Sequence, residues 1–323
     1  MSAHTKTVIE VITDRMLAKN SGVEYHDDYH LTLGVEGGAM RGIISEGMLL
    51  ALYDLGMLDV FDDYVGTSAG SLNLCYTLAG QGALGLSVYL EDMPSKDIVN
   101  LLRFRSELHP MMDMRRLYIR TTEDKQLDLP TLREKYGNNL YIAVSNITKN
   151  RGELFTLKSA GIRFQELLVA GALMPFVAGE PWIVKQNEYF DGGMYYIEPA
   201  ECLPELGSTH ALILNTQPQD IGVKPWGSLV ERKIRSLNKQ HPGAGSLYLS
   251  KLQTYCETIN KLPHGETEYR GQQLYRHALK TSVGVGRLTM DHDKLVEGVK
   301  AGYKSIIDIF YGQGRVGILP TLM

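Results

Sequence analysis

The sequence predicts an α/β protein, a three-layer α/β/α sandwich around a mainly parallel central sheet with a helical elaboration toward its C-terminus. A unit of strand, glycine-rich turn and helix occurs twice in succession within residues 30–79. Short apolar runs typical of buried strands recur at 141–144 and 211–214. Because parallel strands need a crossover between them, this alternation favours a parallel sheet with helical connections.

The elements of the first quarter follow from the spacing of their apolar residues. Residues 6–19 are expected to form an amphipathic helix, and 30–35 a buried strand. A helix at 43–55 follows the first glycine turn, and Gly56 is a plausible stop. Tyr64 and Val65 end a second, short strand, behind which a helix is expected at 71–79.

The rest of the chain is predicted more coarsely, and no linker or repeat divides it. Residues 84–118 have a helical pattern, rich in Met and Leu, which Pro94 and Pro110 interrupt. Strands are expected at 141–144, 153–157, 188–190 and 211–214, with a weaker one at 282–285, and the first two are expected to pair through a turn at 149–152. Helices are expected at 164–173, across most of 226–281, and at 294–310. Residues 1–323 are therefore predicted to form a single domain: a motif-bearing core at about 30–215, a mostly helical elaboration at about 226–281 and a closing helix at about 294–310.

Composition and charge argue against several classes of protein. The net charge of −4 disfavours a nucleic-acid binder, which is usually basic. Cys75, Cys202 and Cys256 are an odd set at wide spacings, so neither a disulfide framework nor a zinc site is expected, and the cytoplasm is the default location. The N-terminus lacks a signal pattern, and no stretch reaches the roughly 18 apolar residues that span a bilayer. We therefore expect any membrane contact to be peripheral; the oligomeric state does not follow from the sequence.

The first glycine turn predicts an anion-binding site. It reads Gly37-Gly38-Ala39-Met40-Arg41-Gly42 and directly follows the apolar run at 31–35. Consecutive backbone N–H groups in such a turn, at the start of a helix, form a concavity that binds negative charge. A dinucleotide site is disfavoured, because the glycines do not have the G-x-G-x-x-G spacing and no strand ending in an acidic residue follows at the expected distance.

The second glycine turn predicts a nucleophile. It reads Gly66-Thr67-Ser68-Ala69-Gly70 and lies between a strand and a helix. Gly66 and Gly70 flank Ser68 because such a corner leaves no room for side chains there. The helix behind the serine directs its positive N-terminal end at the substrate oxygen, where negative charge develops during attack. Together the two turns indicate acyl-transfer chemistry.

A serine hydroxyl needs a base, and the sequence offers two kinds. None of the nine histidines has a distinctive setting, and His210 is expected to cap a strand end. Asp191 differs, because it ends a strand and is followed by Gly192 and Gly193, so it can reach a serine on a neighbouring strand. A triad of Ser68 and Asp191 with either His210 or His277 stays open at this point.

These three motifs, in this order and rough spacing, resemble the patatin-like phospholipases over about residues 30–215. The resemblance implies a three-layer α/β/α fold and a lipid acyl hydrolase with a Ser–Asp dyad, without histidine, metal or cofactor. It implies that Ser68 is the nucleophile, that Asp191 is its base, and that amides of Gly37, Gly38 and Ala39 bind the oxyanion. Arg41, Gly42, Gly66, Gly70, Gly192 and Gly193 would support these motifs.

The chain departs from the family pattern at several positions. Glu36 precedes the first turn where Asp or Ser is usual, and Ala39 replaces the third glycine. If that position needs a positive φ, Ala39 costs on the order of 1 kcal/mol. Glu198-Pro199 replaces the usual Asn-Pro. Arg41 is expected to fix the turn through carbonyls or a carboxylate, with phosphate binding as its alternative role.

Other functions remain open beside a phospholipase A or lysophospholipase. An acyltransferase or thioesterase needs the same first half-reaction, and a non-catalytic lipid- or protein-binding module can use the same fold. Two segments are candidates for lipid contact. Residues 93–114 form either a lid or ordinary core, and 224–239 form a basic amphipathic helix that is expected to be a solvated surface helix rather than a membrane anchor.

Overall fold

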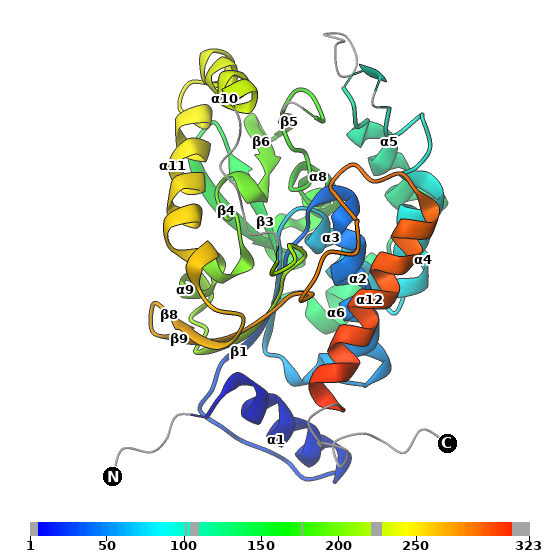
Figure 1. Ribbon diagram of the computed structural model, residues 1–323, viewed down its shortest axis with the longest axis vertical. Helices are drawn as coiled ribbons and strands as arrows, with labels where there is room; N and C mark the ends of the chain where they lie inside the picture. Colours follow the sequence, from blue (N-terminus) through cyan, green and yellow to red (C-terminus); the bar gives the residue numbers. More distant parts are fainter. Residues whose placement is uncertain (1–5, 101, 104–109, 176, 221–227, 312–323) are drawn as a thin grey trace.

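The computed structural model describes residues 6–100, 102–103, 110–175, 177–220 and 228–311. Within them, nine strands form one mixed sheet in the order β5-β6-β3-β2-β1-β7-β9-β8, with β4 paired to β3 (Figure 1). The parallel part comprises β3 (Leu140–Asn146), β2 (Asp63–Gly66), β1 (Leu31–Val35), β7 (His210–Leu214) and β9 (Gln272–His277). Antiparallel strands flank it: β4 (Arg151–Thr156), β5 (Trp182–Val184), β6 (Asn187–Asp191) and β8 (Gly265–Tyr269).

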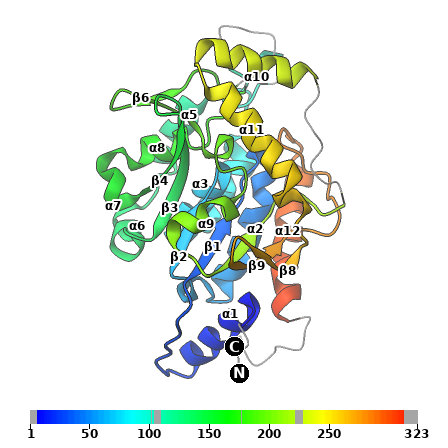
Figure 2. The ribbon, with the colours of Figure 1, turned by 90° about the vertical axis from the view of Figure 1, so that its left-hand side faces the viewer.

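Helices cover both faces of this sheet, as the sequence predicted. One layer contains α2 (Ile43–Asp54), α3 (Ala69–Leu78), α4 (Gly82–Ser87), α8 (Phe164–Ala170) and α12 (His292–Phe310); the other contains α9 (Leu203–Leu206), α10 (Ser228–Gln240) and α11 (Ala244–Glu257) (Figures 1 and 2). The remaining helices are α1 (Val8–Asn20), α5 (Met114–Ile119), α6 (Leu129–Tyr136) and α7 (Leu157–Ala160). The predicted α/β/α sandwich is thus confirmed.

Alternation along the central strands explains why both faces are covered. Leu212 and Leu214 of β7 pack into the larger core, on one face of the sheet. Ala211 and Ile213 of the same strand pack into a separate cluster with Tyr255 of α11. Because successive side chains point to opposite faces, a continuous apolar strand needs a helical layer on each side.

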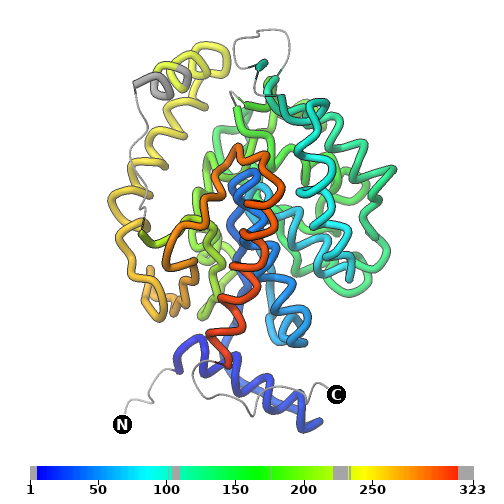
Figure 3. The backbone as a smooth tube through the Cα atoms, turned by 45° about the vertical axis from the view of Figure 1, so that its right-hand side comes forward, coloured from blue at the N-terminus to red at the C-terminus, as the bar shows by residue number. Residues whose placement is uncertain are grey.

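The predicted closing helix is present as α12, and it packs directly on α2 (Figure 3). A Cβ on Gly302 would come within 2.1 Å of the Ile44 carbonyl oxygen, and one on Gly47 within 2.1 Å of the Val299 carbonyl oxygen. Only glycine fits at such backbone contacts. This close packing holds the helix that follows the first glycine turn from its outer side.

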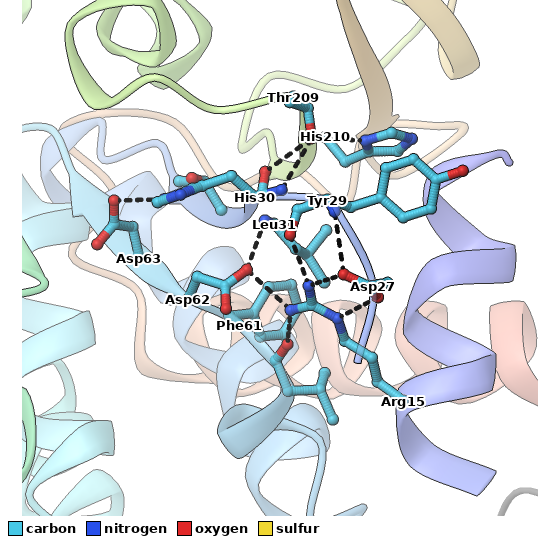
Figure 4. A network of polar contacts seen from close by, with 12 residues as sticks. Arg15, Asp27, Tyr29, His30, Leu31, Phe61, Asp62, Asp63, Thr209 and His210 are labelled. Carbon is cyan, nitrogen blue, oxygen red and sulfur yellow. Dashed lines mark hydrogen bonds and ion pairs between the residues drawn. The ribbon is translucent and has the colours of Figure 1, made fainter. Parts of the chain in front are cut away.

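A polar network fixes α1 at the end of the sheet where the parallel strands begin (Figure 4). Arg15 of α1 forms ion pairs with Asp27 at 2.7 Å and with Asp62 at 2.9 Å. It also donates hydrogen bonds to the carbonyls of Tyr29 and Val60. The network therefore joins α1 to the segments that enter β1 and β2.

One prediction about secondary structure was wrong, and a second holds only in part. Residues 282–285 form no strand; Gly284 has a φ of +75°, and Val285 packs instead against Gly298 of α12. The expected helical elaboration at 226–281 is helical only in its first part, because β8 and β9 form a hairpin at its end. Arg270 and Gly271, both with positive φ, form the two-residue turn of that hairpin, a signal that the sequence carried.

Glu46 of α2 is a buried carboxyl group, and neither of its oxygens has a hydrogen-bond partner among the described residues. Burial raises the pKa of Glu46 well above its usual value, so the folded chain keeps a proton that the unfolded chain releases. Stability contributed by this group is present at low pH and lost as pH rises above the unfolded pKa.

We predict that Glu46→Gln removes this pH dependence. Between the unfolded and folded pKa values, the wild-type protein should lose about 1.4 kcal/mol of unfolding free energy per pH unit relative to the variant. Urea unfolding of both proteins at about pH 5 and about pH 8 measures the difference. Parallel pH profiles for the two proteins would contradict an uncharged Glu46.

Candidate active site

Strand β3 brings together the two strands that carry the predicted reactive residues. Gly66, at the end of β2, pairs with Ile142, and Asp191, at the end of β6, pairs with Val144. Strand β4 occupies the other edge of β3, so β2 and β6 lie one after the other along the same edge. The chain segments that follow Gly66 and Asp191 therefore meet, although more than 100 residues separate them in the sequence.

Ser68 occupies a strained corner between β2 and α3. Its φ of +55° and ψ of −133° lie outside the regions that a serine ordinarily adopts. A Cβ on Gly66 would come within 2.4 Å of Ser71 Cα, and one on Gly70 within 2.3 Å of the Val35 carbonyl oxygen. The two glycines are thus required by close backbone contact, as the motif predicted. The corner leaves Ser68 partly exposed at the N-terminus of α3.

The carboxyl group of Asp191 lies against this serine. Ser68 Oγ donates a hydrogen bond of 2.6 Å to Asp191 Oδ2. The Gly193 N–H donates one of 2.7 Å to Oδ1, and the Asp191 backbone N–H binds the Leu173 carbonyl. Burial raises the pKa of Asp191 to about 6, although the hydrogen bonds from Ser68 and Gly193 to its carboxyl group lower it. At neutral pH the carboxyl group is ionised, and its pKa is close enough to neutral pH for it to accept and release protons.

The first glycine turn packs on the second. A Cβ on Gly37 would come within 2.5 Å of the Ala69 nitrogen and 2.7 Å of the Thr67 carbonyl oxygen. The Thr67 N–H also binds the Val35 carbonyl at 3.1 Å. Within the described part of the chain, the amides of Gly37, Gly38 and Ala39 have no acceptor. The structure thus places three free N–H donors in the turn beside the Ser68 corner.

These observations match a known family. A family model described as patatin-like phospholipase matches residues 33–202, more than half of the chain. The chain belongs to the patatin-like phospholipase family. It therefore has the domain of a lipid acyl hydrolase, and the resemblance inferred from the motifs is confirmed.

Individual relatives are distant. The uncharacterized protein YjjU of Escherichia coli (strain K12) is 23% identical over 248 residues, which cover 76% of this chain and 64% of YjjU. The chain thus spans less than two thirds of that curated relative. VipD from Legionella pneumophila has a TM-score of 0.44 and 12% identity, over 88% of this chain and 67% of VipD. Human GIVD cytosolic phospholipase A2, in complex with methyl gamma-linolenyl fluorophosphonate, has a TM-score of 0.43 and 13% identity, over 95% of this chain and 62% of the enzyme.

The contacts of Glu36 with Arg41 explain why this patatin-like chain has a glutamate before the first turn, where Asp or Ser is usual. Arg41 Nη2 donates to Glu36 Oε1 at 3.3 Å, and its Nε donates to Thr216 Oγ1 at 3.1 Å. Glu36 Oε2 accepts from the Thr216 N–H at 2.8 Å, while Thr216 Oγ1 donates to the Gly37 carbonyl at 2.6 Å. Glu36 thus acts with Arg41 and Thr216 to fix the turn, which agrees with the carboxylate-bound interpretation of Arg41.

The contacts of Glu198 explain the second departure, Glu198-Pro199 in place of the usual Asn-Pro. Its carboxyl group is buried and forms an ion pair with Arg276 of β9, with Nε 2.9 Å from Oε1. The Asn215 side chain donates to the same oxygen at 3.1 Å. The glutamate therefore has a partner from a strand that sequence reasoning missed, and it ties the segment after Asp191 to β7 and β9.

Ala39 has a φ of +52°, so the strain that we expect for a positive φ at this position is present. We predict that Ala39→Gly raises the free energy of unfolding by about 0.5–1 kcal/mol, since relief of 1–2 kcal/mol of strain exceeds the entropic cost of glycine. Urea unfolding measures the change. Ala51→Gly, in the last turn of α2, is the control and should lose at least about 1 kcal/mol, because it also removes a buried methyl group. Equal destabilisation by both substitutions would show that Ala39 is unstrained.

The two candidate histidines lie away from Ser68. His210 lies at the start of β7, whereas Ser68 follows the C-terminal end of the parallel strands. The length of β7, about 13 Å, therefore separates His210 from the end of the sheet where Ser68 lies. His277 ends β9, three strand spacings from β2, or about 14 Å. Its Nε2 bonds with Ser305 Oγ at 2.9 Å, and burial lowers its pKa to about 4. The structure brings neither ring to the Ser68–Asp191 pair.

In the two segments considered for lipid contact, the apolar side chains that the structure describes are mostly packed against protein. Met93, Met111, Met112 and Met114 are all buried, which favours core over a lid for these side chains; residues 101 and 104–109 lie outside the described residues. Ile234 and Leu237 of α10 are buried too, whereas Arg232, Arg235 and Lys239 are exposed. Lys224 and Trp226 lie outside the described residues. Ile234 and Leu237 of α10 therefore face protein, as expected for a surface helix.

Sequence reasoning missed residues that support the site from a distance along the chain. Ser145 of β3 donates a hydrogen bond of 2.9 Å to the Asp191 carbonyl, and Thr216 binds the first turn. A lone serine in an apolar strand and a threonine after one were the available signals. Among the described residues, no cluster of three His, Cys, Asp or Glu side chains could hold a metal ion. No helix in the same ranges is long and apolar enough to cross a membrane.

Proposed function

We propose that the protein hydrolyses lipid carboxylic esters, in the manner of a phospholipase A or lysophospholipase, through a Ser68–Asp191 dyad. The observation that carries this proposal is the 2.6 Å hydrogen bond from Ser68 Oγ to the buried Asp191 carboxyl group. A serine activated by an adjacent base, beside free backbone donors at a helix start, supports acyl transfer.

In the first half-reaction, Asp191 accepts the Ser68 proton while Oγ attacks the ester carbonyl carbon. The carbonyl oxygen becomes an oxyanion, for which the amides of Gly37, Gly38 and Ala39 are the proposed donors. Collapse of this intermediate breaks the ester C–O bond, and the leaving alkoxide takes the proton from Asp191. The products are an alcohol and an acyl group bound to Ser68.

In the second half-reaction, Asp191 takes a proton from water, and the resulting hydroxide attacks the acyl carbon. The same amides hold the second oxyanion. Its collapse breaks the bond to Ser68 Oγ, which recovers the proton from Asp191, and a fatty acid leaves. An acyltransferase differs only here, because an acceptor alcohol or amine replaces the water.

The activity should rise with pH through about 6. Asp191 acts as a base only when ionised, and burial raises its pKa to about 6. Below this value the group is protonated, so kcat/KM should fall about tenfold per pH unit. Initial rates with a short p-nitrophenyl ester measure the profile, with p-nitrophenol read at a wavelength where its absorbance does not change with pH. A profile that stays flat down to about pH 4, the ordinary aspartate value, would contradict a base whose pKa burial has raised.

Labelling with a fluorophosphonate probe, followed by peptide mapping, tests the function directly. The probe phosphonylates an activated serine, so we expect one modified peptide, containing Ser68. A label on another residue, or none on correctly folded protein, would refute the proposal. Product analysis with and without added glycerol distinguishes hydrolysis from acyl transfer: free fatty acid supports the hydrolase, whereas an acylated acceptor as the main product supports the transferase.

A further inference from the structure

The backbone amides proposed to bind the oxyanion belong to peptide groups whose carbonyl ends are held by hydrogen bonds. The Thr216 hydroxyl donates to the Gly37 carbonyl at 2.6 Å, and the Arg41 N–H donates to the Gly38 carbonyl at 3.2 Å. The C=O and N–H groups of a trans peptide point in opposite directions, so a bond to the carbonyl also fixes the direction of the N–H. Thr216 therefore orients the Gly38 N–H, and Arg41 orients the Ala39 N–H.

The peptide group that carries the Gly37 N–H is held by Ser45 of α2. Ser45 Oγ lies 2.9 Å from the Glu36 carbonyl oxygen and 2.9 Å from the Gly42 carbonyl oxygen, but its hydroxyl has only one hydrogen to donate. The Gly42 carbonyl already accepts a hydrogen bond of 2.8 Å from the Asn73 side chain. The hydrogen of Ser45 is therefore available to the Glu36 carbonyl, and this bond orients the Gly37 N–H.

Two buried side chains hold Ser45 from behind the turn. Asn73 of α3 donates from Nδ2 to Ser45 Oγ at 3.2 Å, and its Oδ1 accepts a hydrogen bond of 2.9 Å from the Tyr89 hydroxyl. Tyr89 belongs to the short helix η3 (Val88–Asp92). A Cβ on Gly42 would come within 2.5 Å of Tyr89 Oη, so this hydroxyl packs directly against the end of the turn. Ser45, Asn73 and Tyr89 thus form a series of donors, the Ser45 network.

The Ser45 network ends at the peptide group between Glu36 and Gly37. Within a buried series of hydrogen bonds each bond polarises the next, so donation to the carbonyl makes the N–H of the same peptide group a stronger donor. The network also keeps this N–H in place before an ester arrives. Donors that need no reorganisation stabilise the charge of a transition state most effectively, so we expect an effect on the rate of reaction more than on substrate binding.

We propose that the Ser45 network positions the Gly37 amide toward the oxyanion that forms at Ser68. Its three side chains are positioning residues, because they act through the Glu36–Gly37 peptide group and not on the substrate. This inference rests on the proposed ester hydrolysis. It goes beyond that function because it gives a role in the reaction to three residues that lie outside the glycine-turn and Asp191 motifs.

The test combines two measurements, kcat/KM for a short p-nitrophenyl ester and the inhibition constant Ki of an alkyl trifluoromethyl ketone. Ser68 Oγ adds to the ketone carbon and its proton passes to Asp191, so the ketone oxygen becomes the oxyanion of a stable tetrahedral adduct. Because this adduct resembles the transition state, its Ki reports on the oxyanion donors. A partly unfolded population lowers the measured kcat but leaves Ki unchanged, so Ki separates positioning from a merely structural role.

Ser45→Ala should lower kcat/KM roughly 10- to 100-fold, mainly through kcat, and should raise Ki by a similar factor. Tyr89→Phe removes only the far end of the network and should change both quantities about 3- to 10-fold. Tyr76→Phe is the matched control. Tyr76 is also buried, and its hydroxyl donates to the Lys125 carbonyl at 2.6 Å, in a different segment, so its loss should leave Ki at the wild-type value.

The outcomes separate this inference from the proposed function. A wild-type protein that neither hydrolyses the ester nor binds the ketone refutes the proposed function, and the role of the network falls with it. An active wild-type protein whose Ki is unchanged by Ser45→Ala overturns the network alone, as does an equal rise of Ki in Tyr76→Phe and Tyr89→Phe. Circular dichroism verifies that each variant is folded; if Ser45→Ala does not fold, the two tyrosine variants decide the same question.

Discussion

Replacing Ser68 by alanine is expected to lower kcat for ester hydrolysis by about 10⁴-fold or more, the largest effect of any single substitution in this chain. The substitution removes the oxygen that attacks the carbonyl and forms the acyl-enzyme. Nothing else at the site replaces it, because the other group in contact, Asp191, is buried behind it. Turnover of a p-nitrophenyl ester and of a phospholipid measures the loss.

The same variant also tests strain at the corner. Ser68 has a φ of +55°, which alanine tolerates no better, so Ser68→Ala should keep the fold and a similar thermal midpoint. Ser71→Ala, one turn along α3, is the control: Ser71 is buried behind the corner and has no role in attack, so the rate should change little. Residual activity in Ser68→Ala above about one per cent of wild type would mean that another nucleophile operates.

The features that the sequence predicted well are local ones. The Ser68 corner depends on glycines two positions to either side, because a Cβ at Gly66 or Gly70 would collide with backbone within 2.4 Å. The first turn likewise contains its own requirements, including the positive φ at Ala39. Short-range steric rules decide these conformations, so the sequence alone indicates them.

What escaped prediction depends on register and long-range contact. The sequence indicated that Asp191 could reach Ser68, but not how: β2 and β6 share one edge of β3, and no local pattern specifies that pairing. The β8–β9 hairpin is composed largely of polar residues that alternate with few apolar ones, and it gave a weak strand signal. Two contacts also join residues far apart in the sequence: Glu36 with Thr216, 180 residues on, and Glu198 with Arg276, 78 residues on. Only the folded sheet brings these partners together.

Replacing Asp191 by asparagine is expected to lower kcat/KM by about 10³-fold, the contribution of a well-placed general base. The amide keeps the shape of the carboxyl group and can still accept the Gly193 N–H, but it cannot take the Ser68 proton at any pH. The variant should therefore also lose the pH dependence around 6 that the wild-type carboxyl group confers. Rates measured from about pH 5 to about pH 8 test both effects.

The histidine variants decide between a dyad and a triad. His210 is held by Thr209 and the Lys6 carbonyl, and His277 by Ser305, all remote from Ser68. His210→Gln and His277→Gln should therefore retain activity within about threefold, since neither ring can reach the serine proton. Because an asparagine before Gly192 can deamidate to aspartate, a slow recovery of activity in Asp191→Asn, accompanied by the corresponding mass gain, would support the carboxylate as the base. Loss of activity in either histidine variant, together with full activity in freshly prepared Asp191→Asn, would require a histidine base and would exclude the dyad.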